Sequence, residues 1–176
     1  MRYHNITYPD MNNGDGLRVT LWLSGCSHHC KGCQNVQTWN ADSGITFDES
    51  AKKELFEELA KDYISGITFS GGDPLHENNI DEVLDLIIEI KKRLPTKTIW
   101  LYTGYTWDYL FFNDDNLKEI CNDQTRRAII LGCDIVVDGK YIESLRDISL
   151  KWCGSSNQRV IDVKRSIEED KVVLYE

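Results

Sequence analysis

The sequence predicts an α/β protein built on a mainly parallel sheet. Short apolar runs alternate with amphipathic segments, the order expected when each strand is followed by a helix. The 176 residues suit one domain, but a complete eight-unit (β/α) barrel needs roughly 250. No linker, repeat or low-complexity tract divides the chain. We therefore expect a single domain over residues 1–176, either an incomplete (β/α) barrel or an open sheet.

The first two strand–helix units have the clearest patterns. The first strand is expected at about residues 18–24, and the helix after it begins near Thr46 and Glu49, which have the spacing of a capping box. Its inner face carries Phe47, Ala51, Leu55 and Leu59. The second strand covers residues 66–70, and apolar residues spaced from Ile80 to Leu94 mark a long second helix.

The remaining elements are less regular. Residues 97–103 predict a third strand, and residues 116–121 a short helix. Three further strands are expected at residues 134–137, 158–163 and 172–175.

Composition excludes several classes of function. The chain has 20 basic and 29 acidic residues, a net charge of -9, whereas a nucleic-acid partner requires clustered cations. The amino terminus lacks the apolar core of a signal peptide, and no stretch approaches the roughly 18 apolar residues of a membrane span. We expect a soluble, cytoplasmic protein. Six cysteines are too few for a disulfide scaffold in a chain this long, so a tight group of them indicates metal binding or catalysis.

Three of these cysteines form such a group. Cys26, Cys30 and Cys33 follow the first strand, and no fourth cysteine lies nearby. A 4Fe-4S cluster normally takes four thiolates, so three would leave one iron open to a ligand that is not protein.

The alternative is a structural zinc site. A tetrahedral zinc would take the three thiolates and a fourth ligand from His28, His29 or one of the distant Cys121, Cys133 and Cys153. Spacing alone does not exclude it. We favour the iron–sulfur site because a zinc site would leave the Gly-Gly-Asp-Pro segment, Gly71 to Pro74, without a role. We expect both histidines to be exposed loop residues.

That segment is one of four unusual turns that follow predicted strands. They are the loop that carries Cys26, Cys30 and Cys33, which we call the cysteine loop, then Gly71 to Pro74, residues 103–104 and residues 138–139. Ligands bind at the carboxyl ends of parallel strands, so the four turns predict one shared pocket, although residues 138–139 alone read best as an ordinary strand end. Gly71 and Gly72 permit close backbone approach to a ligand, and Asp73 can accept a hydrogen bond from an amino group.

Together these motifs resemble the radical S-adenosylmethionine (radical SAM) enzymes, and more narrowly the activating proteins of anaerobic ribonucleoside-triphosphate reductases. The narrower resemblance is carried by residues 13–16, 24–26, 30–33 with Asn35, 70–75, 103–105, 137–140 and 154–158. Three positions depart from the patterns. Gly32 stands where radical SAM enzymes in general have a bulky residue, Gln34 where an aromatic residue is usual, and Asp15 where proline is common.

The resemblance implies an incomplete (β/α) barrel of the radical SAM type. It also implies that Cys26, Cys30 and Cys33 hold a 4Fe-4S cluster whose open iron binds S-adenosylmethionine. The backbone of Gly32, Cys33 and Gln34 would meet the adenine end, and Gly71, Gly72 and Asp73 the methionine end. No catalytic side chain is implied, because the cluster and S-adenosylmethionine carry the chemistry.

The implied reaction places a glycyl radical on a separate large subunit, the reductase, with reduced flavodoxin or a similar protein as electron donor. Two other functions remain open from the sequence. One is another short radical SAM enzyme, either a pyruvate formate-lyase type activase or a carboxy-deazaguanine synthase, against which residues 154–158 argue. The other is a zinc-stabilised binding module without turnover.

Overall fold

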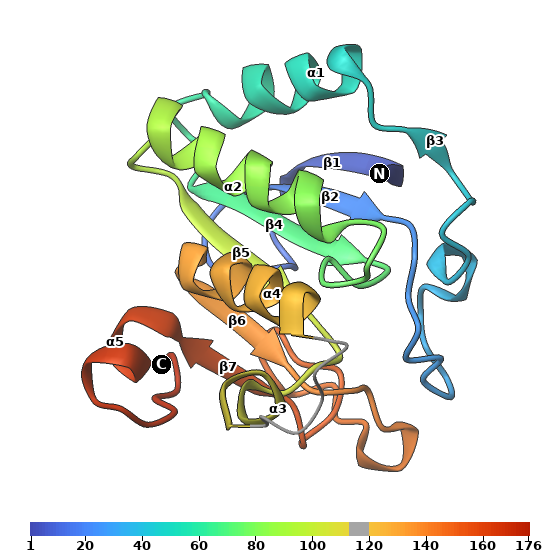
Figure 1. Ribbon diagram of the computed structural model, residues 1–176, viewed down its shortest axis with the longest axis vertical. Helices are drawn as coiled ribbons and strands as arrows, with labels where there is room; N and C mark the ends of the chain where they lie inside the picture. The colour runs from blue at the N-terminus through green and yellow to red at the C-terminus, as the bar shows by residue number, and fades with distance from the viewer. Residues whose placement is uncertain (113–119) are drawn as a thin grey trace.

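The described residues form one mixed sheet that confirms the α/β prediction. The computed structural model describes residues 1–112 and 120–176, and its sheet has the order β3-β1-β2-β4-β5-β6-β7 (Figure 1). The strands are β1 (Arg2–Asp10), β2 (Arg18–Leu23), β3 (Ile45–Thr46), β4 (Gly66–Gly71), β5 (Thr98–Tyr102), β6 (Ile135–Asp138) and β7 (Arg159–Asp162). The central strands β2, β4, β5 and β6 are parallel, whereas β1, β3 and β7 pair antiparallel at the two sides.

Helices cover one face of this sheet. The helices are α1 (Glu49–Leu59), α2 (Ile80–Arg93), α3 (Trp107–Phe112), α4 (Ile120–Gly132) and α5 (Val163–Glu168), with 3-10 turns η1 (Val36–Thr38) and η2 (Glu143–Leu145). Figure 1 shows α1, α2 and α4 lying side by side over the sheet, while α5 lies beside β7 near the carboxyl terminus. None of the helices in the described part of the chain has the length and apolar character of a membrane span.

Successive residues of the parallel strands point to opposite faces of the sheet, and both faces are buried. On β2, Val19, Leu21 and Leu23 point to the helix side and are fully buried there, together with Ile67 and Phe69 of β4. The opposite face carries a smaller apolar cluster of Trp100, Ile135 and Val137, against which Trp152 and Tyr175 pack. Burial on both faces explains why these strands read as near-continuous apolar runs in the sequence.

Arg18 lies in that sheet with no solvent exposure. Its guanidinium donates to the Thr68 hydroxyl at 2.7 Å, and to the carbonyl oxygens of Ile67 at 2.6 Å and Thr98 at 3.0 Å. Burial lowers its pKa to about 10. The neighbouring Asp15 contributes its backbone oxygen at 3.0 Å. Arg18 therefore ties the amino ends of β2, β4 and β5 together, at the edge opposite the cysteine loop.

Most of the predicted elements are confirmed, and the differences have physical causes. Strand β1 was missed because its sequence is largely polar and only Tyr3, Ile6 and Asp10 of it are buried. The capping-box prediction was wrong: Thr46 belongs to β3, and the Asp48 side chain caps α1 by accepting from the Ala51 amide at 2.9 Å.

Two predictions at the less regular end also need correction. The short helix expected at residues 116–121 lies largely outside the described residues, and the helix seen there, α4, continues to Gly132. The strand expected at residues 172–175 is reduced to an isolated bridge between Leu174 and Ile161.

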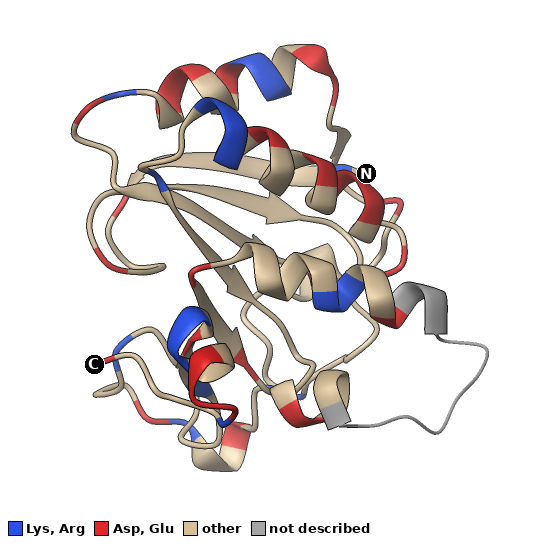
Figure 2. Cartoon of the chain, turned by 60° about the vertical axis from the view of Figure 1, so that its left-hand side comes forward, with Lys and Arg blue, Asp and Glu red and all other residues tan. Residues whose placement is uncertain are grey.

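Charged residues concentrate on the helices, and the sheet carries few (Figure 2). In α2, Asp81 and Glu82 occupy the first turn and Lys91, Lys92 and Arg93 the last, which complements the helix dipole.

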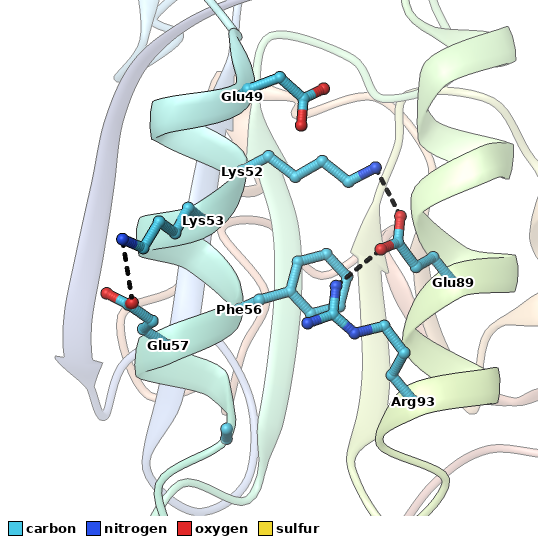
Figure 3. A pocket seen from close by; sticks show the side chains of 8 residues that line it. Glu49, Lys52, Lys53, Phe56, Glu57, Glu89 and Arg93 are labelled. Atoms are coloured by element: carbon cyan, nitrogen blue, oxygen red, sulfur yellow. Dashed lines mark hydrogen bonds and ion pairs between the residues drawn. The ribbon is translucent and has the colours of Figure 1, made fainter.

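A groove of about 480 Å³ runs between α1 and α2, as Figure 3 shows. Lys52 of α1 and Arg93 of α2 both bind the Glu89 carboxylate, at 2.5 and 2.7 Å, and Arg93 lies over the Phe56 ring. These contacts join the two helices, and the residues that line the groove include none of the predicted site residues.

Candidate functional site

The four predicted turns meet at the carboxyl edge of the parallel strands. The carbonyl oxygen of Gly25, in the cysteine loop, accepts from the Asp73 amide at 2.7 Å. The Asp73 carboxylate in turn accepts from the Gly104 amide at 3.0 Å, and the Gly139 amide donates to the Tyr105 carbonyl at 3.0 Å. Each turn thus contacts the next, which confirms that they share one edge.

Backbone hydrogen bonds hold the start of the cysteine loop. The Gly25 amide donates to the Thr38 carbonyl at 2.7 Å, and the Cys26 amide to the Trp39 carbonyl at 3.0 Å. Gly25 has φ +94°, and a Cβ there would lie 3.0 Å from the His76 ring. The loop is therefore folded back on the segment that follows it, at a position that requires glycine.

The Gly-Gly-Asp-Pro turn interlocks with this loop. The Gly72 amide donates to the Leu23 carbonyl at 2.7 Å, beside the bond from Asp73 to Gly25. A Cβ on Gly72 would lie 2.4 Å from the Gly25 oxygen. The structure thus gives a reason for this glycine other than approach to a ligand: the turn and the cysteine loop pass too close for a side chain.

Asp73 is buried at the centre of the edge, with 2% exposure. Its carboxylate accepts from His28 Nε2 at 2.6 Å, from the Thr103 hydroxyl at 3.0 Å, and from the amides of Gly104 and Leu75 at 3.0 and 2.8 Å. The prediction that His28 is exposed was therefore wrong, since its side chain is only 7% exposed.

The three cysteines of the triplet are partly exposed. All the cysteines whose side chains the structure describes are free thiols, including the buried Cys133. Burial raises the pKa of Cys26 to about 11 and also raises that of Cys30. The Cys33 sulfur accepts from the Asn35 amide at 3.3 Å.

Within the described residues, no three His, Cys, Asp or Glu side chains are arranged around a position for one metal ion. A 4Fe-4S cluster binds each thiolate at a different iron, so its ligands need not converge on one point. The donor set fits the cluster, because soft thiolates select iron–sulfur centres and the loop that carries them opens on a cavity. The ligand assignment itself stays a prediction.

That cavity, which we call the tryptophan cavity, has a volume of about 410 Å³. Cys33 and Gln34 line it together with Ser70 at the end of β4 and Tyr102 at the end of β5. Its other walls include Asn12, Asn13, Trp22, Tyr141, Trp152, Cys153 and Gln158. Two of the predicted adenine-contacting residues thus border a space with aromatic walls, whereas the Cα of Gly32, with φ +75°, faces the Glu143 side chain.

The segment 154–158 folds back on residues 139–142. Gln158 Oε1 accepts from the amides of Gly154 and Ser155, at 2.9 and 3.2 Å, and Gln158 Nε2 donates to the Gly139 carbonyl at 3.0 Å. The Ser155 hydroxyl accepts from the Ile142 amide at 3.1 Å. This segment therefore shapes one wall of the tryptophan cavity.

Asp138 has a structural role, as its turn suggested. Its carboxylate accepts from the Trp107 amide at 2.8 Å, at the start of α3, and from Arg159 Nε at 3.0 Å. Arg159 also reaches Asp108 at 2.6 Å, and hydrogen bonding to Asp138 raises the pKa of Arg159. A second cavity of about 700 Å³, the arginine cavity, adjoins this pair and is lined by Arg159, Lys140 and His28.

Sequence reasoning missed the part that His28 and Arg159 play in this edge. His28 lies 45 residues from Asp73 in the sequence, and Arg159 lies 21 residues from Asp138. The signal that was available for His28 is its position inside the cysteine loop.

Comparison with known proteins supports the iron–sulfur interpretation of the sequence. Residues 12–161 match the family described as a 4Fe-4S single cluster domain, a range that contains the cysteine triplet, the Gly-Gly-Asp-Pro turn and the segment 154–158.

Curated proteins named anaerobic ribonucleoside-triphosphate reductase-activating protein are similar over most of the chain. The protein of Haemophilus influenzae is 40% identical over 160 residues, which cover 90% of this chain and 96% of the relative. That of Enterobacteria phage T4 is 40% identical over 160 residues, or 91% and 93% of the two chains. That of Escherichia coli K12 is 39% identical over 162 residues, or 91% and 97%.

Proposed function

Because the chain belongs to the family of anaerobic ribonucleoside-triphosphate reductase-activating proteins, we propose that it generates a glycyl radical on such a reductase by reductive cleavage of S-adenosylmethionine. The observation that carries the proposal is the interlock between the cysteine loop and the Gly-Gly-Asp-Pro turn, where Gly25 and Asp73 are joined at 2.7 Å. This contact puts the proposed metal ligands and the proposed cofactor turn at one edge of the sheet.

Cys26, Cys30 and Cys33 are the proposed ligands of a 4Fe-4S cluster, and they leave one iron for S-adenosylmethionine. When bound, the two cofactors supply an electron and a radical able to abstract hydrogen from a glycine Cα. The chain's own residues orient them and exclude water. The aromatic walls of the tryptophan cavity, Trp22, Tyr102 and Trp152 among them, support this exclusion.

The remaining proposed site residues lie along the same edge of the sheet. We assign the backbone of Gly32, Cys33 and Gln34 to the adenine end, an assignment supported by the position of Cys33 and Gln34 on the tryptophan cavity. Gly71, Gly72 and Asp73 are assigned to the methionine end. The fold proposed for this purpose is a single-domain incomplete (β/α) barrel of the radical SAM type over residues 1–176, in which β2, β4, β5 and β6 provide the parallel part.

The partner of the reaction is the large subunit of the reductase. We propose reduced flavodoxin or a similar protein as electron donor, and a cytoplasmic location, which the free cysteines support because thiols persist in reducing compartments.

The test is activation of the reductase under strictly anaerobic conditions. Reduced protein, S-adenosylmethionine and candidate large subunits are mixed, and electron paramagnetic resonance is expected to detect a glycyl radical on the large subunit. The Cys30→Ala variant should give no signal, whereas Cys133→Ala, which changes a buried thiol outside the triplet, should retain it. A colourless protein that holds one zinc and gives no radical would refute the proposal.

A further inference from the structure

The Asp73 carboxylate joins three separate segments of the site. His28 reaches it from the cysteine loop at 2.6 Å, Leu75 from its own turn at 2.8 Å, and Thr103 and Gly104 from the turn after β5 at 3.0 Å each. With 2% exposure, the carboxylate has almost no access to water. A buried charge of this kind is stable only when donors surround it.

The donors leave little capacity for a further partner. Oδ1 accepts from Leu75, Oδ2 accepts from His28 and Gly104, and the single Thr103 hydroxyl proton is shared between the two oxygens, 3.0 Å from each. Each carboxylate oxygen has two lone pairs, so both are engaged. Because the two backbone amides can only donate, the carboxylate is the acceptor, and His28 Nε2 donates its proton to it.

The His28 ring is held in this orientation by two close contacts. It packs edge-on against Tyr105, with ring centroids 4.7 Å apart. It also fits against Gly104, where an added Cβ would lie 2.3 Å from the ring. Packing therefore aims His28 Nε2 at Asp73.

We propose that His28 is a positioning residue that links the cysteine loop to Asp73. Through this link it fixes the relative positions of the cysteine loop and the Gly-Gly-Asp-Pro turn, which together receive S-adenosylmethionine. The proposal rests on the function proposed above and changes the expected part of Asp73: the carboxylate organises the pocket through its neighbours, with His28 as the link to the cluster. His28 itself is neither a metal ligand nor a proton carrier here.

The experiment compares four variants with the wild type after anaerobic reconstitution. His28→Ala removes the link, and His28→Gln can restore a donor at a similar distance from the backbone. Asp73→Asn removes the charge at the other end. His29→Asn is the matched control, because His29 is the next residue of the same loop, is exposed, and has φ +47°, which asparagine tolerates. Iron content, S-adenosylmethionine affinity by equilibrium dialysis, and the electron paramagnetic resonance spectrum of the reduced cluster are measured for each.

The three cysteines remain in His28→Ala, so iron content should stay near the wild-type value. Affinity for S-adenosylmethionine should fall about tenfold to a hundredfold, the range expected for loss of a hydrogen bond to a charged group, and the spectral change on adding S-adenosylmethionine should weaken with it. His28→Gln should recover most of the affinity, and His29→Asn should match the wild type. The double variant His28→Ala/Asp73→Asn should be no worse than Asp73→Asn alone, because both changes break one link.

Wild-type affinity in His28→Ala would overturn the inference, as would equal losses in His28→Ala and His29→Asn. Loss of iron in proportion to the loss of affinity would also overturn it, since His28 would then serve only to retain the cluster. These results leave the proposed function intact. A wild-type protein that binds no cluster or shows no response to S-adenosylmethionine would instead refute the proposed function.

Discussion

Replacing Gly72 by alanine tests whether the cysteine loop and the Gly-Gly-Asp-Pro turn are interlocked as the structure indicates. The new Cβ would lie 2.4 Å from the Gly25 oxygen, where ordinary van der Waals contact begins at 3.4 Å, so the two backbones must separate by about 1 Å. Both are tied down, because the amides of Gly72 and Asp73 each donate at 2.7 Å across the same gap.

The magnitude follows from these contacts. Overpacking costs about 1–3 kcal/mol, and each stretched hydrogen bond contributes about 0.5–1.5 kcal/mol. With two such bonds across the gap, we expect the Gly72→Ala apoprotein to lose about 2–6 kcal/mol in its free energy of unfolding. Because a 1 Å displacement at a reacting site costs about a hundredfold in rate, generation of the glycyl radical should slow by about that factor.

The assay is urea denaturation of the reduced apoprotein, combined with S-adenosylmethionine binding to the reconstituted protein. Gly132→Ala is the control: its Cβ would meet only the Ile87 side chain, at 2.6 Å, at the end of α4. The Ile87 side chain is buried and branched at Cβ, so Gly132→Ala also overpacks the core and should cost about 1–3 kcal/mol. Because Gly132 lies before the amino end of β6, away from the cysteine loop, S-adenosylmethionine binding should stay unchanged. Unchanged stability in Gly72→Ala would refute the interlock. If binding fell while stability stayed constant, Gly72 would face the ligand instead of the loop.

Three further predictions concern the cysteines and the cavity wall. Alanine at any one of the three triplet cysteines should abolish S-adenosylmethionine cleavage, whereas Cys121→Ala should leave much of it; equal losses at all four would contradict the ligand assignment. Burial raises the pKa of Cys153 to about 11, so only about one Cys153 thiol in a thousand is a thiolate at pH 8. Alkylation of Cys153 by iodoacetamide, followed by mass spectrometry, should be slow at pH 8 and should become about tenfold faster for each pH unit up to pH 11. A rate at pH 8 equal to that of free cysteine would contradict this prediction. Gln158→Ala removes four hydrogen bonds of the cavity wall and should cost about 1–3 kcal/mol in denaturation experiments, with weaker S-adenosylmethionine binding. Unchanged values for both would assign that wall to other residues.

The central sheet was predictable from the sequence because burial leaves a direct record in residue type. Strands β2, β4 and β5 are buried on both faces, so their apolar runs stand out, and α2 shows the helical spacing of its apolar residues. Strand β1 could not be found in this way, since its polar outer face hides the alternation.

The candidate site also has a part that the sequence could predict and a part that it could not. The cysteine triplet and the Gly-Gly-Asp-Pro turn are local patterns, and their common edge follows from the rule that parallel strands present their carboxyl ends together. The bond between His28 and Asp73 spans 45 residues and depends on how the loop folds back on the turn. The spacing of residues along the sequence does not reveal such a contact, which is why His28 was expected to be exposed.

The central claim is that the three cysteines hold a cluster with one open iron, which binds S-adenosylmethionine. Its most direct test is electron paramagnetic resonance of the reduced, reconstituted protein before and after S-adenosylmethionine is added. We predict the signal of a 4Fe-4S cluster that changes when S-adenosylmethionine binds. A cluster fully coordinated by protein side chains, with a spectrum unaffected by the addition, would contradict the claim.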